Sequence, residues 1–390
     1  MGREGFGQLG IIQSTIGSFQ VFAGFQLGLT ATKHIAQYRN TDPHRAGRLL
    51  ALSNVLSLCC GLFVAAVLLV SAQWVASNLL AAPDLSGELK MAALLVLLGA
   101  VNGAQIGALS GFEAFKSIAM VQTVSGVTTF GLTVAGAYLD GLAGVLWGLA
   151  ASTAITVCAS HFALRHHVRA AGIPVNYSAC TSEKRILLNF SLPSLLSNLL
   201  VIPVYWICNV MLVHRPGGYG EMGLLNAVNQ WRTAYLFLPG VIGQVAVPIL
   251  SERFHSANPG NIRGFMRKLL VIHLAVGIPL LLVICGLSPW ILAGYGSDFT
   301  HAWPAFVILQ CAALLQVAQA PVIKFWEATG RMWTNFFMNV GWSACVLVLT
   351  AILVSKGAFG VCLAQLIAFA LFGVALLWFV LRDERYPAHE

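Results

Sequence analysis

Arg232 is the residue whose chemistry fits its surroundings least, because it lies well inside the apolar stretch Met222–Leu250. An arginine at the centre of a bilayer costs ~2.5–3.5 kcal/mol on insertion scales, so we expect its guanidinium to face a wet cavity or a partner. Such a cation can attract an anionic group such as a diphosphate through charge-assisted hydrogen bonds. The alternative is that the side chain extends to the outer membrane interface and plays no direct role.

Three further polar residues lie in the same stretch as Arg232. Together with Arg232 they form the series Asn226, Asn229, Arg232 and Tyr235, in which each residue lies three positions after the one before. On a helix this spacing places successive members near one another. We therefore predict a polar ladder that lines a path for a hydroxyl-rich ligand. Gln13, near the start of the chain, aligns with Asn226 at an offset of 213 residues and joins these candidates.

The candidate carboxylates lie at the ends of apolar stretches, whereas Arg232 lies inside one. Glu113 and Glu327 lie at the ends of predicted spans, where they can form a gate with Lys116, Lys324 or Arg331. The alternative is that these charges only mark helix ends. The nine cysteines are scattered without CxxC spacing, so we expect no metal site, no disulfide framework and no bound cofactor.

Composition identifies the environment of these residues. The chain has 390 residues, of which 58% are hydrophobic and 9% charged, and its mean hydropathy is +0.79. Soluble domains carry roughly 25% charged residues, so we predict a polytopic membrane protein. The formal charge of +8 is then explained by basic cytoplasmic loops, and we expect no nucleic-acid partner.

Eleven stretches are long and apolar enough for a membrane helix, which takes ~20 residues. A membrane barrel would need segments of ~10 residues with alternating polarity. A helix inside lipid satisfies its own backbone hydrogen bonds, so we predict an all-α polytopic bundle. The predicted spans are Gln8–Thr32, Leu49–Ser71, Met91–Gly111, Ile118–Leu139, Ala143–Leu164, Leu188–Val213, Met222–Leu250, Leu269–Leu292, Ala302–Ile323, Trp333–Val354 and Phe359–Leu381.

The basic residues predict the orientation of the bundle. Seventeen of the 22 Lys and Arg residues fall in one set of alternate loops, and four fall in the opposite set. Cytoplasmic loops carry the excess of Lys and Arg. The C-terminus is therefore predicted to be cytoplasmic, and the residues before Gln8 are predicted to lie outside.

The sequence also contains an internal repeat. Gly5–Gly10 (GFGQLG) matches Gly218–Gly223 (GYGEMG) at an offset of 213 residues, and Phe112–Ala114 recurs as Trp326–Ala328 at an offset of 214. Several weak matches in order, at a nearly constant offset, indicate duplication. Both copies have the same orientation, so we predict a parallel repeat of six helices per copy, related by an axis along the membrane normal.

The repeat predicts two lobes. We expect an N-terminal lobe at 1–165, a cytoplasmic linker at 166–187, a C-terminal lobe at 188–381 and a cytoplasmic tail at 382–390. The second copy has six predicted spans and the first has five. We therefore expect that a first helix is missing, through truncation or a misassigned start codon.

Prolines in the second half mark positions where a helix can bend, because proline removes a backbone donor. Pro193 and Pro203 lie in the predicted span 188–213, and Pro239 lies in 222–250. These three are the hinge candidates for any change of conformation. Static kinks that only shape the bundle are the alternative.

Four motifs carry a family resemblance: GFGQLG at Gly5–Gly10, GLTATKHIA at Gly28–Ala36, NFSLP at Asn189–Pro193 and PILS at Pro248–Ser251. With them the chain resembles Wzx-type polysaccharide or O-antigen flippases of the multidrug/oligosaccharidyl-lipid/polysaccharide (MOP) exporter superfamily. The resemblance implies two six-helix lobes across a central cavity and alternating access. It implies movement of an undecaprenyl-diphosphate-linked oligosaccharide across a bacterial inner membrane, for surface polysaccharide or lipopolysaccharide biosynthesis.

The resemblance also implies partners for the protein and leaves alternative functions open. The partners are the lipid-linked oligosaccharide, membrane lipids, and candidate polymerase and chain-length machinery. A multidrug or lipid II exporter of the same superfamily is one alternative, although the former usually relies on buried carboxylates and the latter favours arginines in the first lobe. A membrane-embedded glycan polymerase is another, although such enzymes usually show a large outer loop or catalytic carboxylates. We therefore expect a transporter and not an enzyme.

Overall fold

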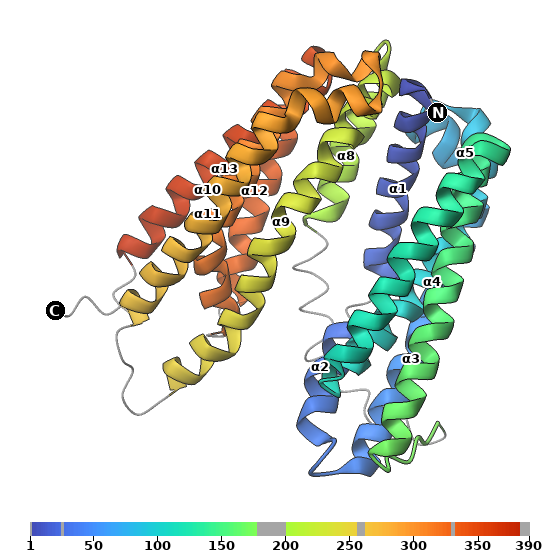
Figure 1. Cartoon of the computed structure of the whole chain (residues 1–390), viewed down its shortest axis with the longest axis vertical. Coiled ribbons are helices and arrows are strands. Elements are labelled where there is room, and N and C mark those ends of the chain that lie inside the picture. Colours follow the sequence, from blue (N-terminus) through green and yellow to red (C-terminus); the bar gives the residue numbers. More distant parts are fainter. Residues whose placement is uncertain (1, 25–26, 178–199, 256–261, 329–331, 383–390) are drawn as a thin grey trace. The chain divides into compact units, whose positions relative to one another are not determined.

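The structure is a computed structural model that describes residues 2–24, 27–177, 200–255, 262–328 and 332–382. Every regular element in these ranges is helical, as predicted, and Figure 1 shows their course. Short π or 3₁₀ turns join some of them: η1 (Val75–Leu79), η2 (Pro83–Leu85), η5 (Ser297–Ala302) and η6 (Val354–Lys356). The α-helices are α1 (Arg3–Gly24), α2 (Leu27–Tyr38), α3 (Pro43–Trp74), α4 (Ser86–Gly111), α5 (Phe115–Ala170), α8 (Ile202–Val213), α9 (Gly218–His255), α10 (Ile262–Tyr295), α11 (Trp303–Ala328), α12 (Met332–Leu353) and α13 (Gly357–Arg382).

Six helical segments of the described chain are long and apolar enough to cross a membrane. This supports a multi-pass membrane protein, although it does not confirm the predicted count of eleven. Two of the six, Phe115–Ala170 and Trp333–Phe379, contain a sharp turn, and each therefore holds two predicted spans. The six are Pro43–Leu79, Pro83–Gly111, Phe115–Ala170, Gly264–Tyr295, Ser297–Trp326 and Trp333–Phe379.

The long helix α5 is a hairpin of two arms. Its backbone leaves the helical region at Asp140 (φ −146°, ψ 28°) and Gly141 (φ 54°, ψ −124°), and the second of these conformations favours glycine. The arms correspond to the predicted spans 118–139 and 143–164. Gly136 and Gly144 face each other beside the turn, where a Cβ on either would overlap the backbone of the other. Glycine therefore both forms the turn and lets the arms approach.

The structure describes the predicted span Gln8–Thr32 as two helical segments, α1 and α2, and residues 25–26 between them lie outside the described residues. The second segment, α2, packs closely on α4. A Cβ at Gly107 would overlap the backbone of Gly28 on α2, and Thr32 Oγ1 donates to the Gly107 carbonyl at 2.9 Å. This close contact with α4 fixes the direction of α2.

Contacts group the chain into two compact units, 11–206 and 2–10 together with 207–390. In the first unit, α4 packs against α2, α3 and α5. Its core includes Ile35, Leu50, Leu109 and Leu164. The predicted lobe and linker boundaries at 165, 187 and 381 stay predictions.

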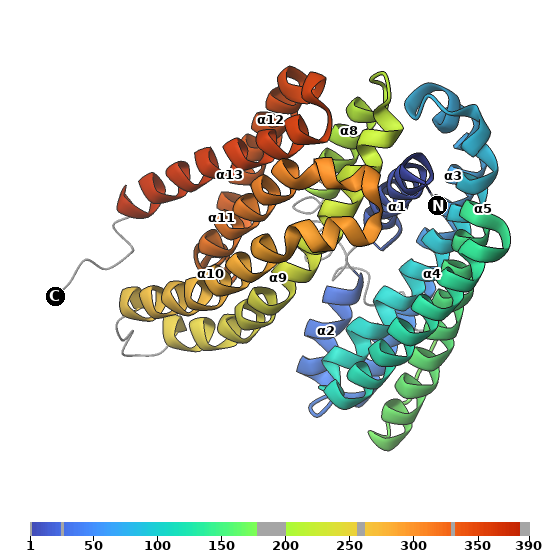
Figure 2. The ribbon, with the colours of Figure 1, turned by 45° about the horizontal axis from the view of Figure 1, so that its top comes forward.

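The second unit is built around α11, which packs against α9, α10 and α13, while α12 packs on α13. The large side chains Phe306, Phe325 and Trp326 of α11 are fully buried. Both views show α10 beside α11, and the α12–α13 hairpin in red (Figures 1 and 2). This central helix, α11, also carries polar residues.

Candidate functional site

Arg232 lies in α9 with its guanidinium in the interior of the second unit, only 9% exposed. One terminal nitrogen donates to Gln316 Oε1 on α11 at 2.9 Å. The other donates to Gln365 Oε1 on α13 at 3.4 Å, and the guanidinium carbon lies 5.9 Å from the centre of the Phe369 ring. The cation is therefore held by neutral amide oxygens and an aromatic face, which support its charge without cancelling it.

The other members of the predicted ladder contact different helices. Tyr235 is fully buried, and its hydroxyl donates to the Gly277 carbonyl on α10 at 3.2 Å. Asn226 is buried and donates to the Phe6 carbonyl on α1 at 3.2 Å. Asn229 is half-buried. The four residues are neighbours along α9, but their side chains do not form one line along a common groove.

Helix geometry explains this spread. With 3.6 residues per turn, a step of three residues rotates back by about 60°. Three such steps bring the direction of Tyr235 to the side opposite Asn226. Arg232 lies between these extremes, toward α11 and α13.

Gln13 lies in the first unit, on α1, and its side chain is exposed. Two residues later Thr15 is fully buried and accepts a hydrogen bond from Trp206 Nε1 at 2.9 Å. Gln13 is thus available to a ligand at the surface of its own unit. Its role in a substrate path stays a prediction.

The hinge candidates fall in three different situations. Pro203 is the second residue of α8, where its missing N–H removes no helical bond. Pro239 is buried within α9, where the missing donor leaves a backbone carbonyl one turn earlier without its usual partner. Pro193 lies outside the described residues. Of the two described candidates, Pro239 is therefore the one with a backbone basis for bending.

The gate candidate Glu113 follows α4 and is exposed. It pairs with Arg39 at 2.9 Å, and Arg39 also donates to the Gly111 carbonyl at 3.3 Å. Its observed partner is therefore Arg39, which the sequence did not single out, and not the predicted Lys116. Glu327 lies near the end of α11, and its side chain lies outside the described part of the structure.

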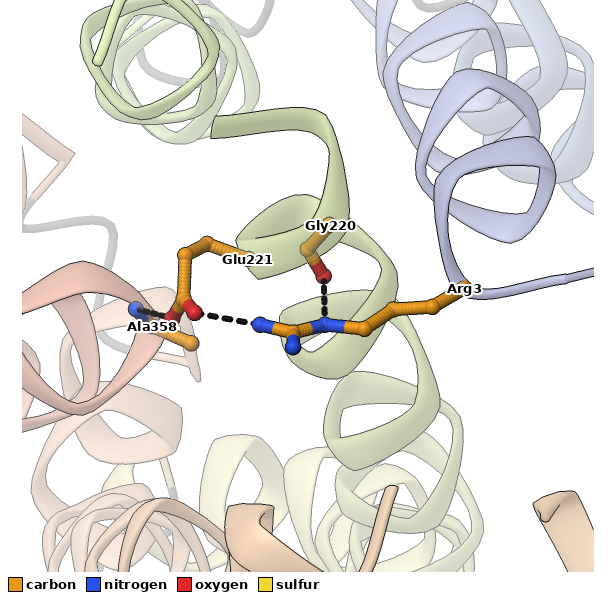
Figure 3. A network of polar contacts seen from close by, with 4 residues as sticks. All are labelled: Arg3, Gly220, Glu221 and Ala358. Atoms are coloured by element: carbon orange, nitrogen blue, oxygen red, sulfur yellow. Dashed lines mark hydrogen bonds and ion pairs between the residues drawn. The ribbon is translucent and has the colours of Figure 1, made fainter. Parts of the chain in front are cut away.

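The sequence missed a network at the start of α9 (Figure 3). The Arg3 guanidinium forms an ion pair with Glu221 and donates from Nε to the Gly220 carbonyl at 2.9 Å. The second Glu221 oxygen accepts from the Ala358 backbone N–H at 2.8 Å. That N–H belongs to the first turn of α13, where a carboxylate is favourable. The Arg3–Glu221 network thus joins the starts of three helices.

Glycines make room for this network. Gly357 has φ 65°, and a Cβ there would overlap the Glu221 carboxylate. On the other side, a Cβ at Gly223 would overlap the Arg3 carbonyl, and one at Gly7 would overlap the Tyr219 carbonyl. The two segments that match in the repeat therefore meet backbone to backbone.

Two clefts flank the ion pair, and both are lined by Arg3 and Glu221. One has a volume of about 530 Å³ and also includes Glu4 and Asp298 in its wall. The other has a volume of about 470 Å³ and includes His301 and Lys356. Beyond the shared ion pair, the first cleft thus adds two carboxylates, and the second adds a lysine and a histidine.

Comparison with known proteins places the chain in a family. Residues 1–254 match the family described as polysaccharide biosynthesis protein. The chain is 28% identical over 182 residues to the EPS I polysaccharide export inner membrane protein EpsE of Ralstonia solanacearum, covering 46% of this chain and 41% of EpsE. It is 24% identical over 258 residues to the lipid III flippase of Escherichia coli (strain K12), covering 64% of this chain and 60% of the flippase.

The matched region is thus less than two thirds of either relative. The fold is similar to an inward-facing multidrug resistance MATE family transporter of the MOP superfamily, with a TM-score of 0.80 at 14% identity. That similarity covers 99% of this chain and 92% of the transporter. With this helical fold and a match over residues 1–254, the chain belongs to the polysaccharide biosynthesis protein family.

Proposed function

We propose that this protein is a flippase that moves an undecaprenyl-diphosphate-linked oligosaccharide across the bacterial inner membrane for surface polysaccharide biosynthesis. The family match over residues 1–254 carries the proposal. Two relatives support it, since one is named for polysaccharide export and the other for lipid III flipping. Alternating access between the two predicted lobes is the proposed mechanism.

The chemistry of the substrate gives Arg232 a role. A diphosphate must leave water to cross the membrane, and its transfer requires a compensating positive charge. Arg232 supplies a buried guanidinium whose contacts with Gln316 and Gln365 keep it oriented. We propose that it attracts the diphosphate during transfer. Asn226, Asn229, Tyr235 and Gln13 stay candidates for contacts with the saccharide.

The orientation and the partners belong to the same proposal. The C-terminus lies in the cytoplasm if the basic loops follow the positive-inside rule. The transported unit then reaches the outer face, where polymerase and chain-length machinery would use it. Membrane lipids surround the helices throughout.

Deletion of the gene tests the function. We expect surface glycan to be lost and the lipid-linked oligosaccharide to accumulate on the cytoplasmic leaflet, protected from a saccharide-specific lectin in intact spheroplasts. The wild-type gene supplied on a plasmid should restore both. Normal surface glycan without accumulated precursor would overturn the proposal, and accumulation of lipid II instead would identify a lipid II exporter.

A further inference from the structure

A cleft with a volume of about 590 Å³ lies in the second unit between α10, α11 and α13. This volume is in the range of sites that hold a small ligand. Its walls are almost entirely aliphatic, and they include Leu270 and Leu274 of α10, Leu315 of α11, and Val374 and Leu377 of α13. We call this cleft the α10–α11–α13 groove.

Small residues keep the groove open. Ala318, Ala370 and Gly373 line it in place of larger side chains. The amide of Gln319 lies over Gly373, where an added Cβ would come within 3.0 Å of Nε2. That nitrogen already donates to the Phe369 carbonyl at 2.7 Å. One N–H of this amide is therefore used within the protein, while its Oε1 accepts no hydrogen bond from the described residues. Apart from Gln319 and Arg267, the groove presents a hydrocarbon surface to an occupant.

One cation lines the groove. Arg267, in the second turn of α10, is an exposed member of the lining. Lys268 follows it and is also exposed, but it does not line the groove. The positive-inside pattern assigns this end of α10 to the cytoplasmic leaflet. A basic pocket between membrane helices on this side is suited to an anionic lipid head group.

We propose that the α10–α11–α13 groove binds one anionic phospholipid, with an acyl chain against the aliphatic walls and the phosphate on Arg267. The acyl chain by itself gains little binding free energy from the groove, because the surrounding lipid is equally apolar. Selectivity therefore comes from the guanidinium and from the shape of the groove. This site is separate from Arg232 and does not depend on the transported substrate.

Native mass spectrometry of the purified full-length protein tests the site, with phosphatidylglycerol and phosphatidylcholine of identical chains as probes. We expect one retained phosphatidylglycerol in preference to phosphatidylcholine. Arg267→Gln should weaken phosphatidylglycerol binding about fivefold, the effect of one basic residue near a membrane surface, and remove the preference. The matched control Lys268→Gln removes the same charge outside the lining. It should keep both the affinity for phosphatidylglycerol and the preference over phosphatidylcholine.

A second pair of variants tests the groove itself. Ala370→Phe should fill it and lower retention of both lipids, while Ala351→Phe adds the same ring to an exposed position of α12 and should have no effect. Equal losses in Arg267→Gln and Lys268→Gln would overturn the proposal, since they would show only general surface charge. Unchanged binding in Ala370→Phe, or displacement of phosphatidylglycerol by an equal concentration of undecaprenyl phosphate, would overturn it as well.

Discussion

Glu221, in the first turn of α9, binds Arg3 of α1 with one carboxylate oxygen and the Ala358 N–H of α13 with the other. The two side chains of the ion pair are 32% and 29% exposed, so water screens them only in part. A fully exposed pair contributes about 0–1 kcal/mol, whereas a hydrogen bond to a charged group contributes about 1.5–3 kcal/mol. We infer that Glu221 stabilises this end of the second unit.

The first prediction is that Arg3 and Glu221 are energetically coupled. Glu221→Ala should lower the free energy of unfolding by about 1.5–3 kcal/mol, because it removes both bonds of the carboxylate. Thermal unfolding of Arg3→Ala, Glu221→Ala and the double variant in detergent gives the coupling free energy between the two side chains. Glu4→Ala, an exposed carboxylate beside the pair, is the control. Effects of the two single variants that simply add would contradict the pairing.

The second prediction concerns two glycines of α9 with opposite surroundings. Gly223→Ala should destabilise the protein by about 1–3 kcal/mol, because its Cβ would overlap the Arg3 carbonyl and force a backbone shift. Gly240→Ala should stabilise it by about 0.5–1 kcal/mol, because its Cβ meets nothing within 4 Å and alanine favours the helix. Melting temperatures of both variants measure this. A gain in stability for Gly223→Ala would show that α1 does not approach α9 closely.

The third prediction uses the backbone at Glu113. Its φ of 56° is a left-handed conformation that costs a non-glycine residue about 1–2 kcal/mol. Its side chain is 60% exposed, so the pair with Arg39 contributes at most about 1 kcal/mol. Glu113→Gly should therefore match or exceed the wild type in thermal stability, whereas Glu113→Gln should fall slightly below it.

The same two variants test the gate. If Glu113 acts as a gate, both should lose transport although the glycine variant is stable. Transport at the wild-type rate in both variants would rule the gate out and leave Glu113 as a residue that only ends a helix.

The fourth prediction concerns the charge of Arg232. Arg232→Gln should reduce restored surface glycan at least tenfold in the deletion strain, because each 1.4 kcal/mol lost is a factor of ten and the lost bonds are charge-assisted. Arg232→Lys keeps the charge and should retain much more activity. Thr233→Val, at the exposed neighbouring position, is the control. Membrane protein levels normalise the result, and full activity of Arg232→Gln would contradict the anion role.

Much of the helical architecture could be predicted from hydropathy, because an apolar run of the right length has few alternatives in lipid. The two arms of α5 appeared as two separate spans, and the turn falls at Asp140 and Gly141 between them. The packing of α2 within the predicted span Gln8–Thr32 could not be predicted in this way. Hydropathy does not record that Gly28 and Gly107 allow the backbones of α2 and α4 to touch.

The surroundings of the candidate site could not be predicted in the same way. Arg232 was conspicuous by its charge, but its partners Gln316 and Gln365 are 84 and 133 residues away. The sequence contained only one indication of the Arg3–Glu221 network, namely two opposite charges near the two matching glycine segments. Pairing across 218 residues depends on how the helices pack, and no local pattern expresses it.

The contact between the two matching glycine segments bears on the origin of the fold. In a protein made of one repeat, two copies of this segment could meet as parallel helices only in a symmetric dimer, where every substitution appears twice. A fused chain removes that restriction. Glu221 corresponds to Gln8 in the first copy, so its ion pair exists on one side only. If the chain arose by the duplication that the repeat predicts, joining the copies in one polypeptide made it possible for a symmetric contact to become asymmetric, with a charge on one copy only.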